Sequence, residues 1–390
     1  MQKILDIFFR IIYNKFMETL PKHKILKRRA MVEENKPTMM TYIKEEQEVL
    51  SNILKNYPDN CPVIKGNNWL ILATGSSINA AYSAKYYIEK ILDVYLTIEE
   101  PFKFHYYEKL KEETDNVIGI SQSGESTSTI DALKAIKKLK LELTMYGLTS
   151  KRESELAQVV NEVIEIENGI ERVGYVTKGF TATIFKLMLS GLKTAKNKGL
   201  ISEQEEAKEL SSFEKAINKI SDIIEKTENF YEKWSEKLGQ AERFTSLCTG
   251  ALIGTAMEMQ TKFSETIRIP SQGMDIEVFM HGHYFEVNSK HQHFYIDSNS
   301  PMNQRLFNLR DYEKRYVGQV YTISLNKSQN DSELGLELEI DEYKAGLFII
   351  IPFQILAHHI AEARGNHLSQ RIYTDFGLAM KSKTKPGDYA

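Results

Sequence analysis

Short runs of consecutive apolar residues alternate along this chain with longer segments in which apolar residues recur every three or four positions. The first pair is NNWLILATGSSINAAYSAKYYIEKIL, whose apolar run at 69–73 predicts a buried strand and whose remainder predicts an amphipathic helix. A second pair is NVIGI, the loop SQSGEST and the helical TIDALKAIKKLK, and ELTMYGLTS predicts a third strand. Strands that alternate with helices predict an α/β fold with a doubly wound parallel sheet, in three layers.

The same order of elements begins again after a charged helical stretch at 201–240, which predicts a connector. FTSLCTG predicts a strand that ends in a glycine turn, and ALIGTAMEMQTKFSETI predicts a helix. HFYIDSNS and VYTISLN predict further strands, and GLFIIIPFQILAHHIAEARG predicts a strand that runs into a buried helix. The repeat of strand, glycine turn and helix at 69–92 and 243–267 predicts two similarly built lobes.

These patterns divide the chain into five parts. We expect a first lobe at 39–200, the connector at 201–240, a second lobe at 241–375 and a C-terminal tail at 376–390 that contributes to the site. Residues 1–38 form an N-terminal extension. Its apolar run is too short and too interrupted to span a bilayer, and its basic cluster follows the apolar stretch, unlike a signal peptide.

Apolar residues in the extension have helical spacing, at Ile4, Ile7, Phe8, Ile11 and Ile12. Three interpretations follow: a peripheral docking helix, a partner-binding helix, or translation from an upstream start with the natural start at Met31 or Met39. The last is preferred.

Composition narrows the functional classes. The 390 residues are 42% hydrophobic and 26% charged, which is typical of a soluble globular protein with two domains. A net charge of −3 gives no reason to expect nucleic acid or a stable membrane association. Cys61 and Cys248 are too few for a disulfide framework or a metal site, so we expect a cytoplasmic protein without a metal or cofactor.

Two loops that follow predicted strands combine small hydroxyl side chains with one glycine. They are TGSS, with Gly75, Ser76 and Ser77, and SQSGES, with Ser121, Gln122, Ser123 and Ser126. Loops at the carboxyl ends of parallel strands, next to helix N-termini, favour anions. Neither loop has a lysine or a nucleotide-binding pattern, which favours a phosphate monoester. The alternative is that these residues only cap helices.

The loops resemble those of the sugar isomerase (SIS) domain family. The resemblance continues in ERVGYVTKGFTATIFKLML and in EMQTKFSETI followed by VFMHGH, which is similar to the isomerase half of glutamine–fructose-6-phosphate aminotransferase. It covers residues 40 to 385, both lobes, in order. The spacing of Lys262, Glu265 and His281 follows the family's K-x-x-E, 15 residues, H arrangement, and Glu258 matches an acidic residue earlier on the same helix.

The chemistry suits these side chains. An isomerase moves a proton between C1 and C2 of a sugar, for which Glu265 is the natural base, with Lys262 one turn away on the same helix face. His281 is suited to opening the sugar ring. The alternatives are a surface salt bridge for Lys262 and Glu265, and the neighbouring His283 in place of His281.

The resemblance implies further roles. The histidine enters the site from the neighbouring subunit, which implies a homodimer with shared active sites. A tail lysine forms a Schiff base with the open ketose; Lys381 is the better match, Lys383 is the alternative, and a frayed basic tail is the other interpretation. Gly174 and Tyr175 depart from the family's usual residues near the sugar. The expected substrate-pocket residues are Gly75, Glu125, Glu171, Gly174, Tyr175, Thr177, Lys178 and Glu258.

The chain lacks the cysteine-bearing glutaminase domain of the large aminotransferase, so ammonia from glutamine is not expected in cis. The resemblance therefore implies a stand-alone fructosamine-6-phosphate or glucoselysine-6-phosphate deglycase, which isomerises a phosphorylated amino sugar to an imine and hydrolyses it to a hexose 6-phosphate and an amine. Two alternatives are an aminating isomerase that resembles glucosamine-6-phosphate synthase and a non-catalytic sugar-phosphate sensor. A sensor with a DNA-binding domain is disfavoured because 38 residues are too few for one.

Overall fold

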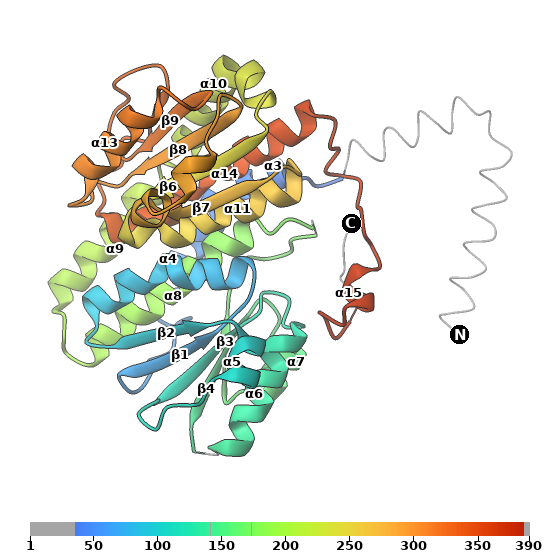
Figure 1. The fold of residues 1–390 in the computed structure, drawn as a ribbon. Helices are drawn as coiled ribbons and strands as arrows, with labels where there is room; N and C mark the ends of the chain where they lie inside the picture. Colours follow the sequence, from blue (N-terminus) through green and yellow to red (C-terminus); the bar gives the residue numbers. More distant parts are fainter. Residues whose placement is uncertain (1–35, 141, 173, 386–390) are drawn as a thin grey trace, which may run out of the picture.

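The computed structural model describes residues 36–140, 142–172 and 174–385. The expected amphipathic helix at the N-terminus lies outside the described residues, as do the last five residues of the tail. The chain from α3 (Met39–Lys55) onward folds into two lobes, each built on one sheet (Figure 1).

The first lobe has a five-stranded parallel sheet in the order β2-β1-β3-β4-β5. Its central strands are buried because they are nearly continuous apolar runs, as parallel strands covered on both faces require. The strands are β1 (Asn68–Leu72), β2 (Tyr95–Glu99), β3 (Asn116–Ile120), β4 (Thr144–Thr149) and β5 (Glu162–Glu165). The helices of this lobe are α4 (Ser76–Ile91), α5 (Pro101–Tyr107), α6 (Thr127–Leu139), α7 (Glu155–Val159) and α8 (Lys178–Asn197).

The second lobe has an equivalent five-stranded parallel sheet in the order β10-β9-β8-β6-β7. When this order is read from β7, its strands correspond one by one to β2, β1, β3, β4 and β5 of the first sheet. β6 therefore occupies the place of β1, and β8 the place of β3. The strands are β6 (Arg243–Cys248), β7 (Ser271–Asp275), β8 (His291–Asp297), β9 (Gln319–Ser324) and β10 (Glu333–Gly335). The helices are α11 (Ile253–Thr266), α12 (Ile276–Met280), α13 (Asn303–Glu313) and α14 (Glu342–Ala363), with short 3-10 turns η1 (Gly250–Leu252) and η2 (His283–Glu286). The doubly wound, two-lobed fold predicted from the sequence is confirmed.

The predicted connector is helical and consists of two helices, α9 (Glu203–Ile217) and α10 (Ile220–Gly239). One prediction of local structure differs from the fold. The strand predicted within GLFIIIPF does not exist, because this segment is the middle of α14. A continuous apolar run fits a buried strand and a fully buried helix equally well, and α14 is buried on nearly all sides. By length and composition α14 is the one described helix that could cross a membrane, but 83% of its most apolar window is buried inside the protein.

The lobes meet through helices rather than through their sheets. α4 and α8 of the first lobe lie against α11 and α14 of the second (Figure 1). The approach of α4 to α11 is so close that a Cβ atom at Gly254 would lie 2.4 Å from the backbone oxygen of Asn79. One apolar core therefore runs through both lobes, and it fixes the N-terminus of α4 against α11.

Candidate active site

The two hydroxyl-rich loops lie at the carboxyl edge of the first sheet, as predicted. Ser76 and Ser77 form the first turn of α4, directly after β1. Ser121 follows β3 and is buried, and its Oγ accepts a hydrogen bond from the Ser126 amide at the start of α6. The loop after β3 thus brings its hydroxyl and amide donors to one helix N-terminus, where the helix dipole favours an anion.

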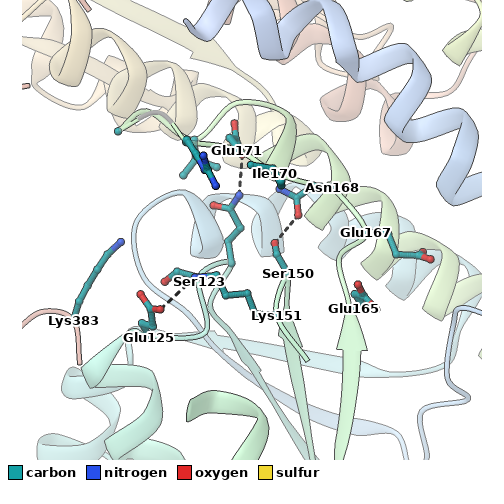
Figure 2. Close-up of a pocket in the computed structure, with 15 residues that line it drawn as sticks. Ser123, Glu125, Ser150, Lys151, Glu165, Glu167, Asn168, Ile170, Glu171 and Lys383 are labelled. Atoms are coloured by element: carbon teal, nitrogen blue, oxygen red, sulfur yellow. Dashed lines mark hydrogen bonds and ion pairs between the residues drawn. The ribbon is translucent and has the colours of Figure 1, made fainter. Parts of the chain in front are cut away.

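Glu171 connects the loop after β3 to the N-terminus of α8. Its carboxylate accepts hydrogen bonds from Gln122 Nε2 at 2.8 Å, from the Thr177 amide at 2.7 Å and from the Gly179 amide at 3.1 Å (Figure 2). A Cβ atom at Gly179 would lie 2.2 Å from Gln122 Nε2, so only glycine allows this approach. Burial raises the pKa of Glu171, although these donors and the charge of Lys178 oppose the shift.

In the second lobe, α11 carries the predicted acid–base residues and lies against the start of α4. Asn79 in the first turns of α4 donates a hydrogen bond to Glu258 on α11 at 2.8 Å. Ser76 also interacts with the Glu258 side chain. Both Glu258 and Asn79 are buried, so the contact is fixed by the packing of the two lobes. The start of α4, after β1, therefore lies against the helix that carries the predicted acid–base residues.

Lys262 is a fully buried cation among carboxylates. Its Nζ lies 2.7 Å from Glu265 and 3.5 Å from Glu258, and Glu171 contributes a further negative charge. Burial acts to lower the pKa of Lys262, but the neighbouring charges outweigh it and the pKa is raised overall, so the side chain stays protonated. Lys262 thus forms a fixed positive charge under the site rather than a proton donor.

Glu265 differs from its neighbours in exposure. Its side chain is 37% exposed, whereas Glu258 and Lys262 are buried. Burial raises the pKa of Glu258, and the charge of Lys262 partly offsets this shift. Of the two carboxylates that contact Lys262, Glu265 is therefore the one that a bound molecule can reach.

A cavity of about 450 Å³ opens beside the loop after β3 (Figure 2). Ser123, Glu125 and Glu171 line it, and Lys151 on the loop after β4 lies 3.3 Å from Glu125. The cavity extends from the loop past the end of β5, and its remaining lining includes Gln122, Ser150, Glu165, Asn168, Arg172, Gly174 and Val176. It therefore offers space next to the hydroxyl-rich loop after β3, with charges of both signs on its walls.

The C-terminal tail reaches this cavity. The amide of Thr384 donates to the Glu125 carbonyl at 3.0 Å, and the Thr127 amide donates to the Ser382 carbonyl at 3.3 Å. Lys383 lines the cavity, on the side away from Asn168 in Figure 2. Lys381 is exposed and has a φ of 50°, in the left-handed region that non-glycine residues rarely adopt. The tail thus brings both candidate lysines close to the loop after β3, with Lys383 on the cavity wall.

His281 lies apart from the other predicted residues of this chain. It follows α12, is exposed, and its Nδ1 lies 2.7 Å from the Glu277 carbonyl oxygen. Within the described part of the chain it has no hydrogen bond or ion pair with Lys262 or Glu265. His283, the other candidate, lies in η2.

The remaining predicted pocket residues form the N-terminus of α8 and the loop before it. Gly174 is exposed and lines the cavity, Tyr175 is half-buried, and Thr177 is buried. Lys178 is also buried, but its ammonium lies 2.5 Å from Glu45 and 4.8 Å from the ring centroid of Tyr42 on α3. In this structure Lys178 holds α8 against α3.

Several polar residues of the site are not predicted from the sequence. Asn79 and Gln354 are buried, and Ser150, Lys151 and Asn168 line the cavity. Ser150 and Lys151 directly follow a predicted strand, so the rule that ligands bind at carboxyl ends of strands could have found them. Asn79 and Gln354 carry no such signal, because they act across elements that are distant in sequence. In the described residues, no group of three or more His, Cys, Asp or Glu could hold a metal ion.

Comparison with known proteins shows what this chain is similar to. Residues 63–192 match the family model of the SIS domain. The glutamine–fructose-6-phosphate aminotransferase [isomerizing] of Synechocystis sp. is 24% identical over 351 residues, which are 85% of this chain and 55% of that protein. The chain therefore spans about half the length of such curated relatives.

Solved structures show the same fold over both lobes. The C-terminal domain of glucosamine-fructose-6-phosphate aminotransferase from Francisella tularensis superposes with a TM-score of 0.77 at 22% identity, covering 85% of this chain and 98% of that one. Glucosamine-6-phosphate deaminase from Thermotoga maritima superposes with a TM-score of 0.71 at 20% identity, covering 86% of this chain and 97% of that one. These likenesses show that the chain shares its two-lobed fold with these two proteins.

Proposed function

From the SIS domain that this chain contains, we propose that the protein is a cytoplasmic phosphosugar isomerase that acts as a deglycase on a phosphorylated amino sugar. The substrate class is a 6-phosphorylated sugar joined to an amino acid, of the fructoselysine or glucoselysine type. One observation carries the proposal. The contact of Asn79, in the helix that follows the loop after β1, with Glu258, on the same helix as Lys262 and Glu265, supports a site shared by the two lobes.

On this proposal the first lobe holds the phosphate. Hydroxyl and amide groups at the starts of α4 and α6 supply neutral donors, and the two helix N-termini add favourable dipoles. The phosphate ligands are Ser76, Ser77, Ser121, Gln122, Ser123 and Ser126.

Glu265 then moves the proton. It removes a proton from one of C1 and C2, which leaves an enolamine, and returns a proton to the other carbon, which converts the C–N bond to an imine. Lys262 stabilises the negative charge that develops on the sugar oxygen. Water adds to the imine carbon, the C–N bond breaks, and the amine leaves with a proton, so that a hexose 6-phosphate and an amino acid are released.

The cavity beside the loop after β3 supports a substrate that is larger than a simple sugar phosphate. Its walls carry Glu125 and Glu165 together with Lys151, which suits the opposite charges of an amino acid. The amine portion of the substrate would occupy this space, with Lys383 of the tail on its far side. If the tail forms a Schiff base with the ketose, Lys381 or Lys383 supplies the amine.

The test supplies fructoselysine 6-phosphate and glucoselysine 6-phosphate and measures lysine and hexose 6-phosphate. The proposal predicts both products in equal amounts. If no lysine appears while fructose 6-phosphate and ammonia yield glucosamine 6-phosphate, the protein is an aminating isomerase. Binding of sugar phosphates with neither reaction would instead identify a sensor.

The proposed enzyme is a homodimer in which His281 enters the partner's site. His281 is exposed and separate from Glu265 in its own chain, and Val278 and Phe285 near it are exposed apolar residues, 53% and 80%. A mixture of Glu265→Gln and His281→Ala chains tests this arrangement. After denaturation and refolding together, the mixture should regain about a quarter of the activity, since a random mixture forms one intact site in half of its dimers. Activity that stays at the level of the separate variants would contradict shared sites.

A further inference from the structure

Glu46 on α3 is a buried carboxyl that the proposed chemistry does not use. It is 0% exposed, and neither of its oxygens has a hydrogen-bond partner among the described residues. An ionised carboxylate without a partner is costly in a protein interior, so the group needs either a counter-ion or a proton. The polar side chains that interact with it are those of Gln354 and Thr181.

Gln354 connects Glu46 to the site. Gln354 lies on α14, is 0% exposed, and donates from Nε2 to the Thr177 carbonyl at 3.2 Å. The amide of the same Thr177 donates to Glu171, and Glu171 accepts from Gln122 of the loop after β3. A line of polar contacts thus runs from Glu46 through α14 and the start of α8 to the proposed phosphate loop.

Among these polar contacts, the side-chain oxygen of Gln354 lacks a hydrogen-bond donor. Gln354 Oε1 is buried and has no partner among the described residues. Because the Thr177 carbonyl can only accept, the amide of Gln354 must present its NH₂ group to it. A protonated Glu46 has a hydroxyl donor to offer to Gln354 Oε1, and this one proton would satisfy both groups.

The charges around Glu46 favour the proton. Glu171 adds a negative charge, while Lys178 at the start of α8 is bound to Glu45. Burial is the main cause that raises the pKa of Glu46 to about 8. Titratable groups on the other helices that pack against α3 include His358 and His359 of α14, Glu228 of α10, which lies 2.8 Å from His359, and Glu206 of α9, which accepts from Tyr57.

We propose that Glu46 is a positioning residue of the sugar-phosphate site, which acts as a neutral carboxylic acid and holds Gln354, Thr177 and Glu171 in place beside the loop after β3. The proposal deepens the proposed function, because it assumes that this loop binds sugar phosphate. It also predicts a pH dependence. Ionisation of Glu46 above pH 8 places an unpaired charge beside Gln354 and weakens ligand binding.

The test uses two neutral substitutions of similar length. Glu46→Gln keeps hydrogen-bonding groups, whereas Glu46→Met removes them, and Glu48→Gln on the exposed face of α3 is the control. The dissociation constant of fructose 6-phosphate is measured calorimetrically from pH 6.5 to 9.5. We expect Glu46→Gln to bind at pH 7 as wild type does and to lose the weakening above pH 8. Glu46→Met should bind about 5- to 10-fold more weakly at pH 7, the loss of one hydrogen bond.

Two results would overturn the proposal. Equal weakening in Glu46→Gln and Glu46→Met would show that the carboxylate itself is needed, and wild-type binding by Glu46→Met would show that Glu46 has no positioning role. Thermal unfolding of the same proteins gives a readout that does not need a ligand. Since the folded pKa of Glu46 lies above the ordinary value, wild type should lose stability relative to Glu46→Gln as pH rises from 5 to 9.

The two readouts separate the failure of this proposal from that of the proposed function. Absence of fructose 6-phosphate binding in wild type would count against the proposed function alone. Parallel stability curves for wild type and Glu46→Gln would count against a neutral Glu46, whatever the ligand.

Discussion

The two lobes share a strand order, yet the equivalent loops at their central strands differ in charge. β3 of the first lobe ends at a loop that begins with Ser121, a neutral hydroxyl. β8, in the same place of the second sheet, ends at Asp297, whose carboxylate accepts from Asn303, Ser324 and Asn326. A carboxylate with satisfied hydrogen bonds repels a phosphate and leaves no donors for it.

The difference indicates that two lobes of the same fold have different roles. The first lobe places neutral hydroxyl side chains at its helix N-termini, whereas the equivalent loop of the second lobe carries a carboxylate held by internal hydrogen bonds. What the second lobe contributes is α11, whose Lys262 and Glu265 face the first lobe across the contact of Asn79 with Glu258. The proposed division is therefore phosphate binding in one lobe and proton transfer in the other.

The largest expected effect concerns the second lobe. Replacing the proposed base by an isosteric amide, Glu265→Gln, should lower kcat about 10²- to 10⁴-fold, because a general base contributes about this much. The dissociation constant of fructose 6-phosphate should change little. Steady-state kinetics and calorimetry measure the two quantities, and Ser264→Ala, an exposed neighbour on α11, is the control. A kcat within about threefold of wild type would remove Glu265 from the mechanism.

A smaller effect is expected in the first lobe. Ser121→Ala should raise KM for the phosphorylated substrate about 10- to 100-fold, since a hydrogen bond to a charged group is worth about 1.5–3 kcal/mol, while kcat falls less. Ser298→Ala, in the equivalent loop after β8, should leave KM unchanged. If Ser121→Ala lowers kcat and leaves KM intact, the division of labour between the lobes is wrong.

The smallest effect is on stability. His293 on β8 is buried, and burial lowers its pKa from 6.5 to about 3. The folded state therefore keeps it neutral while the unfolded chain takes up a proton below pH 6.5, so stability is lost as pH falls. When the pH falls from 7 to 5, wild type should lose about 2 kcal/mol more stability than His293→Leu. The figure follows from about 1.5 pH units below the ordinary pKa of 6.5, at about 1.4 kcal/mol per unit. Urea unfolding at both pH values measures this; equal losses in both proteins would show that His293 is protonated when folded.

The sequence predicts the parts of this account that depend on one element at a time. The buried runs before TGSS and SQSGES are β1 and β3, and the amphipathic segments after them are α4 and α6. β2 and β7, by contrast, are not predicted. Their residues YLTIE and SQGMD lack a continuous apolar run, because these strands are only partly covered.

The site is predicted only in part for a related reason. Lys262 and Glu265 lie one turn apart on a helix, so their contact follows from spacing alone. The contact of Asn79 with Glu258 joins residues 179 positions apart, and it depends on how α4 packs against α11. Glu46 and Gln354 become neighbours for the same reason, through the packing of α3 on α14.

The central claim is that Glu265 moves a proton on a sugar whose phosphate the first lobe holds, and its most direct test is the reaction in D₂O. Wild type and Glu265→Gln are each given fructoselysine 6-phosphate, and the released hexose 6-phosphate is analysed by mass spectrometry. Because the proton on partly exposed Glu265 exchanges with solvent, the account predicts up to one carbon-bound deuterium in the wild-type product, and in Glu265→Gln a loss of both lysine release and deuterium. Lysine release that is equally fast in both proteins, without deuterium in the sugar, would contradict it.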